Sequence, residues 1–158
     1  MTSISDTRAL DAWSAYRRLR LSLDAEVARD LERDCGLSMP DYDVLAATSE
    51  LSDGEHCIRV RDLATHLGWA HSRLSRQLGR MEGRGLIARE KCELDGRGED
   101  VVLTGEGRQA LARAAPVHAA SVRHRFAELL TSEQLSALVD IANRLAPPGT
   151  GSFRTGTP

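Results

Sequence analysis

Apolar residues recur every three or four positions from Leu10 to Leu31, a spacing that predicts one long amphipathic helix over about residues 7–33. Gly36 is expected to end this helix. The run Ser-Met-Pro-Asp at 38–41 then supplies an N-cap residue, a proline in the first turn and an acid three positions after the cap. It predicts a second helix that continues to about Glu50.

Two shorter helical patterns follow a β-leaning run at 57–60. The first ends at Gly68, and the second covers about residues 70–84. In the second helix the apolar positions, which are expected to face inward, are Leu74, Leu78 and Met81. The positions expected to form an exposed basic and polar face are Ser72, Arg73, Arg76, Gln77 and Arg80. Helix, glycine turn and helix in this order are typical of a helix-turn-helix, whose second helix enters the major groove of DNA.

A β-hairpin is predicted next, because residues 86–93 and 101–103 favour strands and Asp-Gly-Arg-Gly at 95–98 favours a turn. A hairpin directly after a helix-turn-helix forms a wing. Thr104 is expected to cap a helix over about 105–130, with its apolar side at Leu111, Ala115, Val122, Phe126 and Leu129. The fold class is therefore mainly α with a small β-hairpin wing.

The end of the chain contains one more predicted helix and a tail. Thr-Ser-Glu-Gln at 131–134 is a capping box that opens the last helix. Residues 147–158 are rich in Pro, Gly, Ser and Thr, which predicts disorder. No apolar run approaches the roughly 20 residues of a membrane span, so we expect a cytoplasmic protein.

The net charge of −2 in 158 residues is unevenly distributed. Between Trp69 and Arg89 five basic residues accompany one acid, which gives this segment a charge of +4 and the remainder −6. A basic segment on an acidic body is typical of a protein that binds nucleic acid with one element.

The runs LGWAHSRLSRQLGRMEGRGLIARE, DGRG and VVLTGEGRQAL together resemble the multiple-antibiotic-resistance-regulator (MarR) family of bacterial transcription factors. The most specific positions are Ser75 and Arg76 in the second helix, Arg84-Gly85-Leu86 before the wing, and Leu103-Thr104 after it. The chain departs from the family at Ala70, where a capping Ser, Thr or Asp is more usual, and in a wing with one arginine between its two glycines.

The resemblance implies a transcriptional regulator, expected to be a repressor, that binds a pseudo-palindromic DNA operator as a homodimer. It implies residues 1–36 and 105–146 as dimerisation helices, 37–104 as the DNA-binding lobe and 147–158 as a tail. It also implies release from DNA by a small aromatic or phenolic effector, and we expect no cofactor.

Several side chains are assigned to DNA. The groove is expected to hold Ser72, Arg73, Arg76 and Gln77, since Arg can bond guanine and Gln adenine through paired hydrogen bonds. The resemblance adds Ser75. Arg80 and Arg84 are expected to hold phosphates, and Arg97, between two glycines, to enter the minor groove. The alternatives are a solvated basic surface and, for Arg97, a simple turn residue.

An effector site is predicted on the first helix, where Trp13 and Tyr16 lie near Arg17 and Arg20 and could hold an aromatic anion. The resemblance adds Asp62 and Arg89. The alternative is that the two aromatic residues belong to the dimer contact.

Other function classes are less well supported. The three cysteines have no paired spacing and no two histidines lie four apart, so neither a disulfide framework nor a metal site is expected. Cys92 leaves a redox-responsive regulator open as an alternative. No phosphate-binding loop or nucleophile elbow points to an enzyme. A winged helix that binds only protein would present acidic or apolar residues where this chain has arginines.

Overall fold

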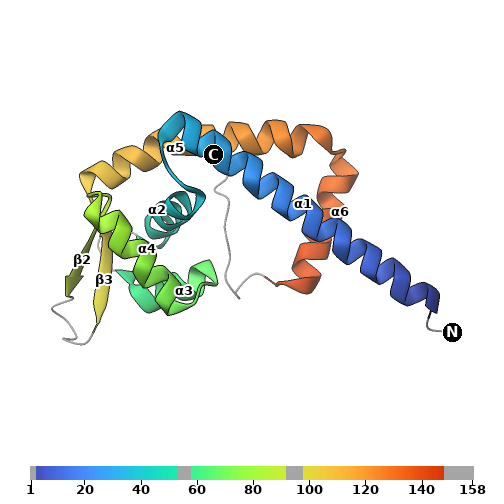
Figure 1. Ribbon diagram of the computed structural model, residues 1–158, viewed down its shortest axis with the longest axis horizontal. Coiled ribbons are helices and arrows are strands. Elements are labelled where there is room, and N and C mark those ends of the chain that lie inside the picture. Colours follow the sequence, from blue (N-terminus) through green and yellow to red (C-terminus); the bar gives the residue numbers. More distant parts are fainter. Residues whose placement is uncertain (1–2, 53–57, 92–97, 148–158) are drawn as a thin grey trace.

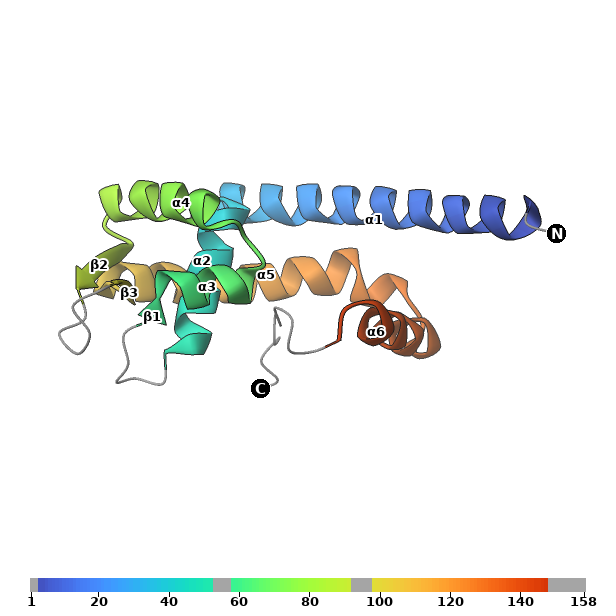
Figure 2. The same cartoon turned by 90° about the horizontal axis from the view of Figure 1, so that it is seen from below.

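The computed structural model describes residues 3–52, 58–91 and 98–147. Its elements are, in order, α1 (Ser3–Cys35), α2 (Met39–Leu51), β1 (Ile58–Arg59), α3 (Val60–Leu67), α4 (His71–Gly83), β2 (Ile87–Lys91), β3 (Glu99–Leu103), α5 (Gly105–Arg125), a 3₁₀ turn η1 (Ala127–Leu129) and α6 (Ser132–Leu145). Helices α2 to α4 and the strands form a lobe at one end, while α1, α5 and α6 extend away from it (Figures 1 and 2). The predicted fold class is confirmed.

The wing contains one strand more than the predicted hairpin. β2 and β3 pair antiparallel with Ile87 opposite Leu103, and β1 pairs with the other edge of β3 through Ile58 opposite Val101. The short β-leaning run before α3 therefore closes the sheet at its base and attaches the wing to the helix-turn-helix.

The helix-turn-helix is built around Gly68, whose φ of +65° only glycine adopts without strain. Its N–H donates to the Thr65 carbonyl at 3.2 Å, and the N–H of Trp69 donates to the Ala64 carbonyl at 2.9 Å. These two bonds satisfy the last carbonyls of α3 and allow α4 to start two residues later.

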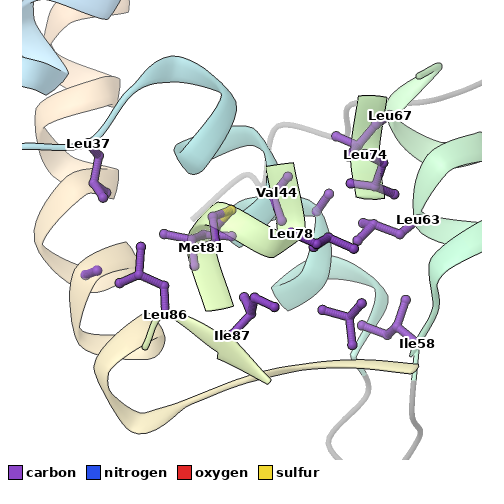
Figure 3. Close-up of a cluster of buried hydrophobic side chains, with 14 of the residues drawn as sticks. Leu37, Val44, Ile58, Leu63, Leu67, Leu74, Leu78, Met81, Leu86 and Ile87 are labelled. Carbon is purple, nitrogen blue, oxygen red and sulfur yellow. The ribbon is translucent and has the colours of Figure 1, made fainter. Parts of the chain in front are cut away.

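One side of α4 forms the centre of the lobe. Leu74, Leu78 and Met81 are fully buried, as their spacing predicted. They meet α2, α3 and β2 at residues such as Val44, Leu63 and Ile87 (Figure 3). This cluster fixes which side of α4 is left for solvent.

The three predicted helix starts are confirmed. The Ser38 hydroxyl accepts the N–H of Asp41 while the Asp41 carboxylate accepts the N–H of Ser38. Thr131 and Gln134 form the same reciprocal pair at α6. Thr104 accepts the N–H of Gly107 at 2.9 Å at the start of α5.

The predicted apolar side of α5 is partly wrong. The helix ends at Arg125, and the side chain of Leu129 in the following turn is 74% exposed. The buried residues of α5 are all small: Gly107, Ala110, Ala114 and Ser121. α1 packs closely along α5, so small side chains are favoured there over the larger ones that the periodicity selected.

An ion-pair network joins α1 to α5. The Arg125 guanidinium donates to both oxygens of Asp30, at 2.7 and 3.0 Å, and the Ser121 hydroxyl donates to the same carboxylate. Hydrogen bonds from Arg125 and then Ser121 hold the pKa of Asp30 well below its usual range.

Among the described residues, no helix has both the length and the apolarity that a membrane span requires.

Candidate nucleic-acid interface

The first half of α4 presents side chains that form no hydrogen bond or ion pair with the other described residues. Ser72, Arg73 and Arg76 are exposed, and Ser75 is partly buried beside them. Neither Arg73 nor Arg76 forms an ion pair or a side-chain hydrogen bond among the residues that the structure describes. Their guanidinium donors are therefore available to an external acceptor.

The N-terminus of α4 is also open. Ala70 is its N-cap and has no side-chain bond to give, and no acid occupies the first turn. Within the described part of the chain, no side-chain cap accepts the first backbone N–H groups of α4, and no acid offsets the positive end of its dipole. Such an end favours phosphate oxygens.

Arg73 lies over the ring of Trp69, with its Cζ atom 4.1 Å from the ring centroid. Trp69 precedes the N-cap and packs, partly buried, against the core of the lobe. This cation–π contact is the only one found for a predicted groove residue within the described part of the chain.

Side chains in the second half of α4 form hydrogen bonds within the protein. Gln77 is only 3% exposed, and its amide donates to Asp41 at 2.7 Å. Arg80 donates to the Gln77 amide oxygen, and Arg84 donates to the other oxygen of Asp41 at 2.6 Å. The prediction that Gln77 belongs to the exposed face is therefore wrong, because a buried carboxylate of α2 draws it inward.

Arg84, which was predicted to hold a phosphate, is also bonded within the protein in this structure. Besides Asp41 it donates to the Gly36 carbonyl at 3.3 Å, so it ties the end of α4 to the start of α2. Asp41 was predicted only as a capping acid. Its partners lie 36 and 43 positions away, and no local pattern links them.

Arg89 on β2 joins α4 to the wing. Its guanidinium donates to Glu82 of α4 at 3.2 Å and to Glu99 of β3 at 3.4 Å. Gly79 leaves room for it, since an added Cβ there would lie 3.3 Å from an Arg89 nitrogen. This side chain, predicted as an effector contact, is bound within the lobe.

The carboxyl group of Asp43 on α2 has a shifted titration. Burial raises the pKa of Asp43 to about 6, with Arg73 acting in the opposite direction and Asp24 in the same direction as burial. A raised pKa means that the folded state holds the proton more tightly than the unfolded chain. The resulting stability is complete below about pH 4 and is lost as the pH rises through about 6.

Asp43→Asn should therefore be more stable than the unmodified protein by about 2 kcal/mol near pH 8 and equally stable near pH 4. Urea unfolding at both pH values measures this difference. Asp62→Asn is the matched control, because the Asp62 side chain is 61% exposed. A gain for Asp43→Asn that does not change with pH would contradict the prediction.

Comparison with known proteins decides what kind of lobe this is. The MarR family model matches residues 36–98. AbsC of Streptomyces coelicolor, a MarR family transcriptional regulator, is 39% identical, with 87% of this chain and 90% of AbsC covered and a TM-score of 0.80. The chain belongs to the MarR family. Another MarR protein of that organism, Sco3205, solved in complex with DNA, is 32% identical over 90% of this chain and 95% of its own, with a TM-score of 0.77. The transcriptional regulator HosA of Escherichia coli O157:H7 is 29% identical over 131 residues, which are 83% of this chain and 93% of HosA.

The family and fold are thus those of transcription regulators and not of enzymes. In this MarR chain the predicted effector residues are not gathered in one place. Trp13, Tyr16, Arg17 and Arg20 are exposed on the part of α1 that projects from the lobe. Asp62 and Arg89 belong to α3 and β2 inside the lobe (Figures 1 and 2).

Three predictions for this MarR chain fall outside the described residues. The structure does not describe Arg97, which was predicted to be at the wing tip, nor Cys92 or the tail from 148 to 158. The minor-groove role of Arg97 and the redox alternative based on Cys92 stay sequence predictions.

Proposed function

We propose that this MarR-family regulator binds a specific operator in double-stranded DNA as a homodimer and represses transcription by occupying a promoter. The observation that carries the proposal is the exposed half of α4, where Arg73 and Arg76 have no ion-pair partner among the described residues. The uncapped helix end beside them favours a phosphate group. Together they offer base-edge and backbone contacts on a single element.

The apolar surface outside the lobe supports a dimer. Both α1 and α6 carry large apolar side chains that are at least 45% exposed. On α1 these are Leu10, Trp13, Tyr16, Leu19 and Leu21, and on α6 they are Val139, Ile141 and Leu145. Helix α6 has no buried residue. Helix α1 projects from the lobe, and α6 lies at the end of α5 that is away from the lobe (Figure 1). Monomers rarely expose so many large apolar side chains on two helices, so a second copy is their natural partner.

Selection of bound DNA from a random library tests the proposal. A homodimer with two lobes should select an inverted repeat whose half-sites lie about 34–36 Å apart, one turn of B-DNA. Enrichment of a single unrepeated half-site would contradict the dimer. No enrichment at all would favour a winged helix that binds only protein.

Arg76→Ala is expected to reduce discrimination at one base pair of that operator by roughly 5- to 150-fold, as for the loss of one paired contact of about 1–3 kcal/mol. Arg80→Ala removes a charge farther along α4 and should weaken all sequences alike, lowering the salt slope by about 1. Binding curves at several salt concentrations separate these effects. Unchanged base preference in Arg76→Ala would contradict the assignment of Arg76 to the groove.

A small aromatic effector completes the proposed mechanism. The rings of Trp13 and Tyr16 lie 5.6 Å apart on exposed α1, with Arg17 and Arg20 exposed one turn along the helix. A ligand bound between the lobes and the dimer base would change the lobe spacing and so the fit to DNA. A panel of phenolic acids, assayed for loss of operator binding, tests this step. If no compound in the panel reduces operator binding, Trp13 and Tyr16 are assigned to the dimer contact instead.

A further inference from the structure

Trp69 occupies the junction between the two helices of the helix-turn-helix. Its N–H is bonded to the Ala64 carbonyl at 2.9 Å, and its ring packs partly buried against the core of the lobe. Backbone and side chain are thus both fixed by the lobe. The ring forms a rigid surface one turn before Arg73.

The guanidinium group of Arg73 lies over the face of the Trp69 ring. The Cζ atom of Arg73 lies 4.1 Å from the ring centroid, a stacking distance. The N–H donors of a guanidinium group point outward in its plane, so a ring on its face leaves them free. None of the Arg73 donors has a hydrogen-bond acceptor among the described residues.

Little else in the lobe orients Arg73. It is the third residue of a helix whose first turn has no acid and whose N-cap, Ala70, has no side-chain bond. A cation at this end of a helix is disfavoured by the helix dipole, so the arginine gains no support from its own helix. Asp43 acts on Arg73 through its charge alone, since no hydrogen bond or ion pair joins the two side chains within the described residues.

We propose that Trp69 is a positioning residue for base recognition, holding the guanidinium of Arg73 so that its donor edge is preorganised to bond the O6 and N7 atoms of one guanine. The inference rests on the proposed function, because it assigns the geometry of one of its contacts. An arginine already ordered in the free protein loses less side-chain freedom on binding, so Trp69 contributes to sequence discrimination without touching DNA.

The test uses the full-length protein, the operator recovered by selection and a set of duplexes with each base pair changed in turn. Arg73→Ala should lose roughly 5- to 150-fold in discrimination at one guanine position. Trp69→Leu should lose discrimination at that same position and leave the salt slope unchanged, since indole has no charge. Trp69→Phe should retain most of it, and the double variant should be no worse than Arg73→Ala.

A uniform loss across all duplexes in Trp69→Leu, or a double variant whose losses multiply, overturns the inference and leaves the proposed function standing. Equal binding of every duplex by the unmodified protein overturns both. If Trp69→Leu does not fold, Trp69→Met takes its place, because methionine fills apolar space without an aromatic face. In the DNA-free protein, the Arg73 side-chain protons should show an upfield ring-current shift by NMR, and its absence also overturns the inference.

Discussion

Gly107→Ala is expected to lower the free energy of unfolding by about 3 kcal/mol. A Cβ atom at this position would lie 1.9 Å from the Leu86 carbonyl oxygen and 3.0 Å from the carbonyl carbon. Leu86 cannot simply withdraw, because its oxygen also accepts the Thr104 N–H at 3.3 Å. The start of α5 would have to move away from the wing.

Gly105→Ala is the matched control, since no atom lies within 4 Å of the added Cβ and the residue is in the same helix turn. Urea unfolding at one fixed protein concentration measures both variants, because the stability of the proposed dimer would depend on concentration. Equal stability of the two variants would contradict the close approach of α5 to Leu86.

Asp41→Ala is expected to cost a similar amount, about 3 kcal/mol. It removes the acceptor of buried Gln77, the ion-pair partner of Arg84 and half of the capping box at α2. Gln77 then keeps an unpaired amide in the core, which accounts for much of the loss.

Asp34→Ala is the control for this effect, because Asp34 also pairs with an arginine, Arg33, but is more exposed and serves no buried group. It should change stability by less than about 1 kcal/mol. The change in unfolding free energy, followed by circular dichroism, separates the two variants. A loss no larger than that of Asp34→Ala would show that Gln77 finds another partner.

Much of the lobe could be predicted from the sequence because its signals are local. A cap and its partner lie three residues apart, as at Ser38 or Thr131, and Gly68 ends a helix by its own conformation. The inward stripe of α4 follows from helical periodicity alone. The basic face of that helix followed from the same periodicity.

What the sequence did not predict depends on distant partners. Gln77 lies off the apolar stripe, and only the carboxylate of Asp41 on another helix explains its burial. On α5, periodicity chose larger apolar residues, whereas the residues that close packing buries are small ones such as Ala110 and Ala114. Apolarity alone could not distinguish the side that meets α1 from the sides left exposed.

The bonds of Arg89 and Asp41 have a mechanical consequence. Arg89 on β2 bonds to α4 and to β3, and Asp41 holds the same helix to α2. We therefore expect α4 and the wing to move together as one unit. If an effector changes operator binding as proposed, we expect it to move each lobe as a whole relative to α1 and α5.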